Sequence, residues 1–204
     1  MKNMLKDALI LMAITLVAGA FLGLVHEITK KPIAQQQEKA KTDAYAEVFK
    51  DADHFTVMEG FDTDQALSVL HENNFDNEKI TEVMMAFDKN QQLLGYVISV
   101  DSTEGYSGDI VFSMGVSLNG TINGVSVLSI SETAGLGMNA EELLAPQFAG
   151  KNVDQFSYTK DGATIESQID AISGATITTK AVTEGVNAGL VYFRTLSTGG
   201  NEND

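Results

Sequence analysis

The sequence predicts an α+β protein in which a single N-terminal transmembrane helix and a helical stalk precede a domain with a twisted antiparallel sheet packed by helices. An uncharged stretch at 8–25 predicts the transmembrane helix. Strand-like segments separated by turn residues at 80–131 predict the sheet. A final segment has apolar residues at helical spacing, which places one of its faces on the sheet; these residues are Val182, Val186, Leu190 and Phe193.

The apolar stretch 8–25 (ALILMAITLVAGAFLGLV) is near the lower length limit of a membrane-spanning helix. Gly19 and Gly23 have the spacing that lets another transmembrane helix approach closely. Charged flanks and the terminal position argue against a buried core helix of a soluble protein. Residues 18–20 resemble a signal-peptide cleavage site, but the apolar run continues to Val25, so we favour an uncleaved anchor over residues 1–27.

The orientation of the anchor does not follow from its flanking charges. Lys2 and Lys6 stand on one side and Lys30 and Lys31 on the other, so the positive-inside count is nearly balanced. A short N-terminal tail followed by one anchor and an acidic domain more often leaves the domain outside the cytoplasm. We therefore predict a single-pass protein of the cell membrane with an extracytoplasmic domain.

Residues 28–79 are assigned to a helical stalk and a connecting segment. Apolar residues recur among Gln, Lys and Glu, which predicts a helix from Glu27 to about Lys50; they are Ile33, Ala40, Ala44, Val48 and Phe49. Pro32 fits a first helical turn or a break after the membrane segment. Residues 51–77 are acidic and mixed, with a weak helical pattern at 64–72.

The domain proper is assigned to residues 80–197. Segments 82–88 and 93–100 flank a polar turn and predict one hairpin, and segments 110–118 and 122–130 flank Asn119-Gly120 and predict a second. A short helix interrupted near Pro146 is expected at 140–148, then a loop and an edge strand at 154–167. The last helix is expected from Thr178 to Leu196, before a frayed tail at 198–204.

The composition excludes several classes of function. The chain carries 28 acidic and 13 basic residues, a net charge of −15, which argues against binding nucleic acid or anionic lipid. The absence of cysteine removes disulfides, Fe–S clusters and thiolate metal sites. His26, His54 and His71 are scattered without metal-site spacing. No general base or nucleophilic triad is visible, so we assign no catalytic residue and no metal site.

The segment 170–180 (DAISGATITTK) is the most distinctive polar stretch. It holds four hydroxyls close together, on Ser173, Thr176, Thr178 and Thr179. Gly174 and Ala175 keep the turn small enough for a ligand to approach its backbone, and the N–H groups of the following helix suit an anion such as phosphate. An ordinary helix cap is the alternative, because the segment lacks the Gly-Lys-Ser/Thr ending of a P-loop.

Two loops contain more glycine than a simple turn needs, at 104–108 (EGYSG) and 132–137 (ETAGLG). Glycine permits a positive φ angle or a close approach of backbone to a ligand, although turn chemistry alone accounts for the pattern equally well. Together with Asp170-x-x-Ser-Gly-Ala-Thr176, these loops resemble the FMN-binding domain of the G subunit of Rnf complexes and the related C subunit of the sodium-translocating NADH:quinone reductase. The resemblance covers about 80–204, and the anchor and stalk match the same architecture.

This resemblance implies a redox subunit rather than a stand-alone enzyme. It would be a membrane-anchored flavoprotein that relays electrons within an ion-translocating ferredoxin:NAD oxidoreductase, coupled to sodium ions or protons. The implied partners are the other subunits of the complex and a flavin transferase of the ApbE type, which recognises the Asp-x-x-Ser-Gly-Ala-Thr pattern. The overall length favours the Rnf subunit over the longer quinone-reductase subunit.

The resemblance also implies roles for particular residues. Thr176 would carry covalent FMN through a phosphoester, with Ser173, Gly174, Ala175 and Thr178 around the phosphate. Asp170 would cap the turn or hold the metal used during flavin transfer. Contacts with the flavin ring would come from the two glycine loops, through Tyr106, Glu132, Thr133 and Leu136.

Two departures from the family pattern and two alternatives remain. Ala134 replaces the usual proline of the second glycine loop, and Ser107 replaces a glycine of the first. One alternative is the equivalent subunit of a sodium-translocating NADH:quinone reductase. The other is a membrane-tethered binding or scaffold module without flavin, in which 173–179 is a plain helix cap.

Overall fold

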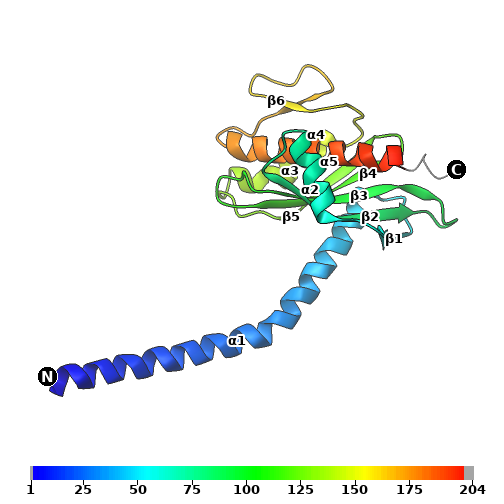
Figure 1. The fold of residues 1–204 in the computed structure, drawn as a ribbon. Helices are drawn as coiled ribbons and strands as arrows, with labels where there is room; N and C mark the ends of the chain where they lie inside the picture. The colour runs from blue at the N-terminus through cyan, green and yellow to red at the C-terminus, as the bar shows by residue number, and fades with distance from the viewer. Residues whose placement is uncertain (1, 200–204) are drawn as a thin grey trace. The chain divides into compact units, whose positions relative to one another are not determined.

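The structure, a computed structural model, describes residues 2–199 (Figure 1). The chain divides into two compact units, Met1–Ala40 and Lys41–Asp204. Most of the predicted tail, residues 200–204, lies outside the described residues.

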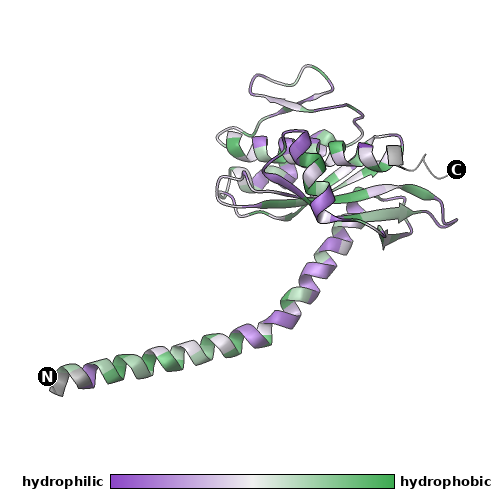
Figure 2. Cartoon of the chain, viewed as in Figure 1, coloured by the Kyte–Doolittle hydropathy of each residue, from purple (hydrophilic) through white to green (hydrophobic). Residues whose placement is uncertain are grey.

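A single helix, α1 (Lys2–Val48), contains both the predicted anchor and the predicted stalk helix. Figure 2 shows its apolar N-terminal part giving way to a polar part toward its C-terminal end. One 18-residue window has a mean hydropathy of 2.6 and is apolar enough to cross a membrane. Pro32 lies inside the helix, so both alternatives, a first helical turn and a helix break at this residue, are wrong. Within the apolar part, Thr15 donates its hydroxyl hydrogen to the Leu11 carbonyl at 3.1 Å, so this polar group is paired within the helix.

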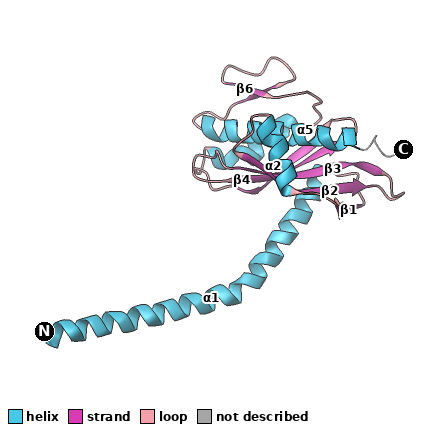
Figure 3. Cartoon of the chain, viewed as in Figure 1, coloured by secondary structure: helices cyan, strands magenta, loops and turns pink. Residues whose placement is uncertain are grey.

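The second unit is built on one antiparallel sheet with the order β1-β2-β3-β4-β5 (Figure 3). Its strands are β1 (His54–Val57), β2 (Glu78–Phe87), β3 (Leu93–Ser102), β4 (Ile110–Ser117) and β5 (Ile122–Ser129). The two predicted hairpins are confirmed. Strand β2 starts earlier than predicted, because its first residue is the ionisable but buried Glu78. Strand β1 was not predicted, since its four residues are too few to establish an alternation.

Helix α5 (Thr176–Gly199) packs on one face of the sheet. It starts at Thr176 rather than Thr178 and continues past Leu196. The four apolar residues predicted to face the sheet are all buried: Val182, Val186, Leu190 and Phe193. Gly185 and Gly189 let the helix approach, because a Cβ on Gly185 would lie 2.9 Å from the Phe112 ring and one on Gly189 would overlap the sulfur of Met114.

Shorter elements complete this layer. Helix α2 (Thr63–Glu72) covers β2 and confirms the weak pattern at 64–72. A 3-10 turn, η1 (Gly137–Asn139), leads into α3 (Ala140–Leu143) and α4 (Ala145–Phe148), with Pro146 in the first turn of α4 as predicted. Strands β6 (Ser157–Thr159) and β7 (Gln168–Asp170) form a parallel pair. The predicted edge strand is β6, and β7 was not predicted.

The last turns of α1 pack on the other face of the sheet. Tyr45, Val48 and Phe49 are at most 5% exposed and contact Ala86 and Val97. They are separated from the α5 core because successive strand residues point to opposite faces. Residues that we assigned to the stalk therefore belong to the core of the second unit.

Hydrogen bonds fix this end of α1 to strands β2 and β5. The Tyr45 hydroxyl donates to Glu82 at 2.5 Å, and Lys41 lies 3.0 Å from the same carboxylate. Burial alone would raise the pKa of Glu82, but Tyr45 and Lys41 outweigh it and hold this pKa below its usual value. Across the sheet, Ser126 donates to the Glu47 carboxylate at 2.9 Å.

The outer edge of β5 is covered along most of its length. At one end, Ile122 donates its N–H to the Lys151 carbonyl at 2.9 Å and accepts from Gly150 at 2.7 Å. At the other end, the Glu141 carboxylate accepts the backbone N–H of Val127. Burial raises the pKa of Glu141, and the nearby charge of Glu47 adds to the effect. The N–H and carbonyl groups of Ile122 and the N–H group of Val127 are thus already paired.

Candidate functional site

A cavity of about 510 Å³ lies where the two glycine loops meet the start of α5. Its volume is within the range of small-molecule and cofactor sites. It is lined by Tyr106, Glu132, Thr133, Leu136, Gly137, Gly174, Ala175, Thr176, Ile177 and Thr178. Eight of these are residues predicted from the sequence to bind a cofactor. Gly137 and Ile177 were not among them, although both lie inside the motifs that pointed to the site.

The turn before α5 is held by one threonine. Thr179 accepts the Ile172 N–H on its hydroxyl at 3.1 Å and donates to the Ala175 carbonyl at 2.9 Å. Gly174 adopts φ = 78°, a conformation that favours glycine. The helix therefore begins at Thr176, whose half-buried side chain faces the cavity. The first N–H groups of an α-helix have no partner within the helix, so those of residues 176–178 are available to an anion.

Glu132 joins the two glycine loops to each other. Its side chain is 9% exposed, and its Oε1 accepts the N–H of Tyr106 at 2.6 Å and that of Ser107 at 3.4 Å. A Cβ on Gly137 would lie 2.5 Å from the Thr178 hydroxyl and 2.8 Å from the Cβ of Glu132. Only glycine fits at that position, so the second loop can approach α5 closely.

Apolar side chains form one wall of the cavity. Leu136 reaches the turn before α5, since its Cδ2 lies 3.2 Å from the position of a Cβ on Gly174. Tyr106, Leu136 and Ile177 are 66%, 38% and 50% exposed. An apolar wall opposite free backbone N–H groups suits a ligand with a flat hydrophobic part and an anionic end.

Two predicted site residues do not line the cavity. Ser173 is exposed on the turn. Asp170 accepts the N–H of Ala163 at 2.5 Å on its carboxylate, while its own N–H donates to Gln147 at 2.7 Å. In the described residues, Asp170 therefore holds the loop before β7, and the expectation that it caps the turn at 172–175 is not met.

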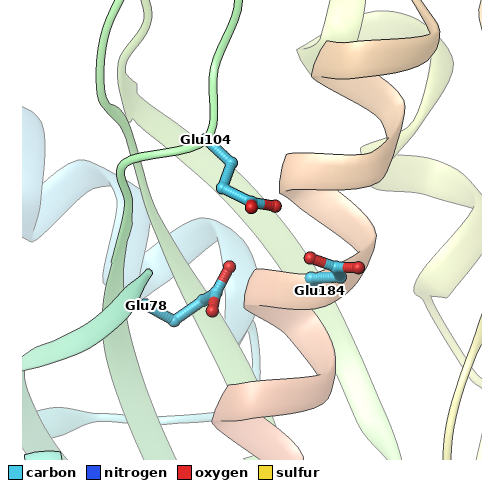
Figure 4. A group of neighbouring side chains, drawn as sticks. All are labelled: Glu78, Glu104 and Glu184. Atoms are coloured by element: carbon cyan, nitrogen blue, oxygen red, sulfur yellow. The ribbon is translucent and has the colours of Figure 1, made fainter. Parts of the chain in front are cut away.

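A cluster of three carboxylates lies beside the cavity, and sequence reasoning missed it. One oxygen from each of Glu78, Glu104 and Glu184 lies within 4.8 Å of the others (Figure 4). Lys180 on α5 contacts Glu104 at 2.6 Å and Glu184 at 3.2 Å. The members come from β2, the loop after β3, and α5, and no local pattern connects segments so far apart in the chain.

Replacing Glu132 by alanine is expected to release the 105–108 loop. The change removes an ionised acceptor from two backbone N–H groups, a loss worth about 1–2 kcal/mol, or about tenfold in local opening. Hydrogen exchange at the Tyr106 amide should therefore accelerate about tenfold. Glu132→Gln, which keeps a side-chain acceptor, is the matched control. Unchanged exchange in Glu132→Ala would show that the loop is held by other contacts.

Comparison with known proteins agrees with this geometry. Residues 105–191 match the family model of the FMN-binding domain, and residues 1–48 match that of the RnfG N-terminal region. The G subunit of the Na⁺-translocating ferredoxin:NAD⁺ oxidoreductase complex of Acetobacterium woodii is 32% identical over 96% of this chain and 94% of that protein. The G subunit of the proton-translocating complex of Clostridium ljungdahlii is 30% identical over 90% of this chain and 88% of that protein.

Among solved structures, the crystal structure of NqrC from Shewanella oneidensis aligns with 59% of this chain and 60% of that chain. The TM-score is 0.49 and the sequence identity is 23%.

Proposed function

Because the chain belongs to the family of G subunits of ion-translocating ferredoxin:NAD⁺ oxidoreductase complexes, we propose that it is a membrane-anchored flavoprotein that relays electrons within such a complex. One observation carries the proposal. The cavity in the matched FMN-binding domain brings both glycine loops and Thr176 together.

The residues of the cavity fit FMN. Gly137 leaves free a space next to Thr178 that a Cβ would fill, and Gly174 does the same next to Leu136. The N–H groups at the start of α5 suit the phosphate, and the Thr133 hydroxyl can hydrogen-bond the edge of a flavin ring. Leu136, Ile177 and Tyr106 offer apolar surface. Bound FMN would supply the electron-carrying chemistry, and these side chains would bind it and exclude water.

We propose covalent attachment at Thr176. The bond would join the Thr176 hydroxyl oxygen to the phosphorus of FMN, releasing the hydroxyl proton and the leaving group of the flavin donor. Support comes from the position of Thr176, which lines the cavity at the positive end of the α5 dipole. Thr178 is 1% exposed and Thr179 is engaged in the turn, so both are poorer acceptors of the phosphoryl group.

The membrane arrangement follows from α1, which we propose as a single-pass anchor with the FMN-binding domain outside the cytoplasm. Outside the cytoplasm a dissociating flavin would be lost to the medium, whereas the proposed covalent bond keeps it on the protein. Partners would be the other subunits of the complex and a flavin transferase. The two relatives are named for different coupling ions, so this subunit is not proposed to determine the ion.

The equivalent role in a sodium-translocating NADH:quinone reductase is the second candidate. Two relatives that match at least 90% of this chain are named as G subunits of ferredoxin:NAD⁺ oxidoreductase complexes, which favours the first.

The test is co-expression of the full chain with a flavin transferase. We expect a band that fluoresces under ultraviolet light on a denaturing gel, and an intact mass increased by one FMN. A transferase exported from the cytoplasm should modify the chain, whereas one retained in the cytoplasm should not. A colourless chain of unmodified mass would contradict covalent attachment, and modification by the cytoplasmic enzyme alone would reverse the orientation.

A further inference from the structure

The carboxylate cluster beside the cavity carries more negative charge than its neighbours can balance. Lys180 neutralises one unit, through its contacts with Glu104 at 2.6 Å and Glu184 at 3.2 Å. Glu78 is 2% exposed, and it accepts hydrogen bonds from neutral groups, the Ser102 hydroxyl at 3.4 Å and the backbone of Asn77. Burying an uncompensated carboxylate is costly, and such a group takes up a proton instead.

The directions of the pKa shifts in the three carboxyl groups agree with this excess of negative charge. Burial, followed by the charges of Glu184 and Glu104, raises the pKa of Glu78 to about 7. Burial also raises the pKa of Glu184, and the adjacent Glu104 adds to the effect. The contact with Lys180 lowers the pKa of Glu104, so Glu104 is the member that stays ionised.

Titratable groups on the other elements around β2 are engaged elsewhere. His71 on α2 pairs with Asp76 at 3.9 Å, and His54 on β1 pairs with Asp53 at 3.6 Å. His54 lies opposite Phe87, at the far end of β2 from Glu78. On β3, burial and the charge of Asp109 raise the pKa of Asp101, while Lys79 opposes them. The carboxylates that these groups contact are not those of Glu78, Glu104 and Glu184.

The cluster is connected to the wall of the cavity through the backbone. Glu104 immediately precedes Gly105 and Tyr106, the start of the loop that Glu132 holds. Asn77, next to Glu78, donates its amide to Glu104 at 2.8 Å. On the other side, Lys180 is one helical turn after Thr176. The Glu104–Lys180 ion pair thus ties the 105–108 loop to the first turns of α5.

We propose that Glu78 and Glu184 hold a proton at neutral pH, and that this proton keeps the Glu104–Lys180 ion pair closed, so that the 105–108 loop stays docked at the cavity. Losing the proton adds a buried negative charge that repels Glu104 and competes for Lys180. The loop is then released. This proton-dependent docking of the 105–108 loop is a property of the chain itself and does not rest on the proposed flavin.

The direction of the pH dependence follows from the raised pKa of Glu78. A carboxyl whose pKa is higher in the docked state than in the released state favours docking when it is protonated. Burial is the main cause of the raised pKa of Glu78, about 7, and the charge of Glu104 adds to it, so the docked position of Glu104 is favoured while Glu78 is protonated and loses this contribution as pH rises past about 7.

The test is hydrogen exchange of the full chain in detergent, expressed as protection factors corrected for the intrinsic rate at each pH. The Tyr106 amide, which donates to Glu132, reports docking directly. We expect its protection to fall as pH rises from about 6 to 8 in the wild type. Glu78→Gln imitates the protonated group and should remove the dependence. The Asn90 amide, bonded to Asp88 at 2.8 Å, is the internal control, because the pKa of Asp88 is lowered by its backbone contacts and does not titrate in this range.

Three results would overturn the proposal. The first is that protection of the Tyr106 amide in the wild type stays constant across this pH range. The second is that Glu78→Gln shows the same dependence of protection on pH as the wild type. The third is that added Ca²⁺ or Mg²⁺ restores protection at pH 8, which would replace the proton by a cation. If Glu78→Gln does not fold, Glu184→Gln provides the same comparison at a position that is 36% exposed.

Discussion

Co-expressed with a flavin transferase, a Thr176→Ala variant is expected to yield a folded but non-fluorescent chain of unmodified mass. Alanine removes the hydroxyl that would form the phosphoester and is well tolerated in the first turn of a helix. Thr176 is half-buried and lies outside the densely packed core, so the urea midpoint should change little. Fluorescence on a denaturing gel and intact mass measure the loss, which should be complete.

Two matched variants locate the attachment atom. Thr176→Ser keeps a hydroxyl at the same position and should remain flavinylated, although with a lower yield. Thr178→Ala removes the neighbouring hydroxyl, which is 1% exposed, and should also remain flavinylated. A fluorescent Thr176→Ala together with a colourless Thr178→Ala would place the bond at Thr178 instead.

In truncated proteins that lack most of α1, the position of the first residue should decide whether the domain folds. A protein starting at Lys41 keeps the side chains that cover the second face of the sheet, whereas one starting at Asp51 lacks Tyr45, Val48 and Phe49. Each of these side chains contributes about 1.5–3 kcal/mol by burial. Their combined loss is comparable with the whole stability of a domain, about 5–15 kcal/mol. The shorter protein should be unfolded or insoluble, and the longer one soluble with a cooperative urea transition.

The matched control for this truncation is Tyr45→Phe in the longer protein. It retains the ring and removes only the hydrogen bond to Glu82, which should cost about 1–3 kcal/mol and leave the domain folded. Equal urea midpoints for the two truncated proteins would show that residues 41–50 add nothing to the core.

Structural features that depend only on residues close together in the sequence could be predicted. The Asn119-Gly120 turn specifies its own hairpin, and the spacing of Val182, Val186 and Leu190 specifies the buried side of α5. Strands β1 and β7 escaped prediction because each is too short to show a period of two. Their pairing is determined by the sheet and loop against which they lie.

The cavity could be predicted in part for the same reason. Each of its three segments has a local pattern, and their meeting followed from family resemblance rather than from periodicity. The sequence could not show that Glu132 bonds the Tyr106 amide, because this contact spans 26 positions. The neighbours of Glu78 were hidden too, since α5 supplies Glu184 only after the helix has packed on the sheet.

The paired edge of β5 affects whether neighbouring copies of the domain on one membrane surface can associate through their sheets. Proteins held on a bilayer diffuse in two dimensions and collide often, and an open strand invites a neighbour to extend the sheet. Here Glu141 and the 150–151 backbone occupy one edge, while the opposite edge, β1, is only four residues long. Crowded copies therefore have little exposed main chain to share, which protects the domain from aggregating by strand exchange.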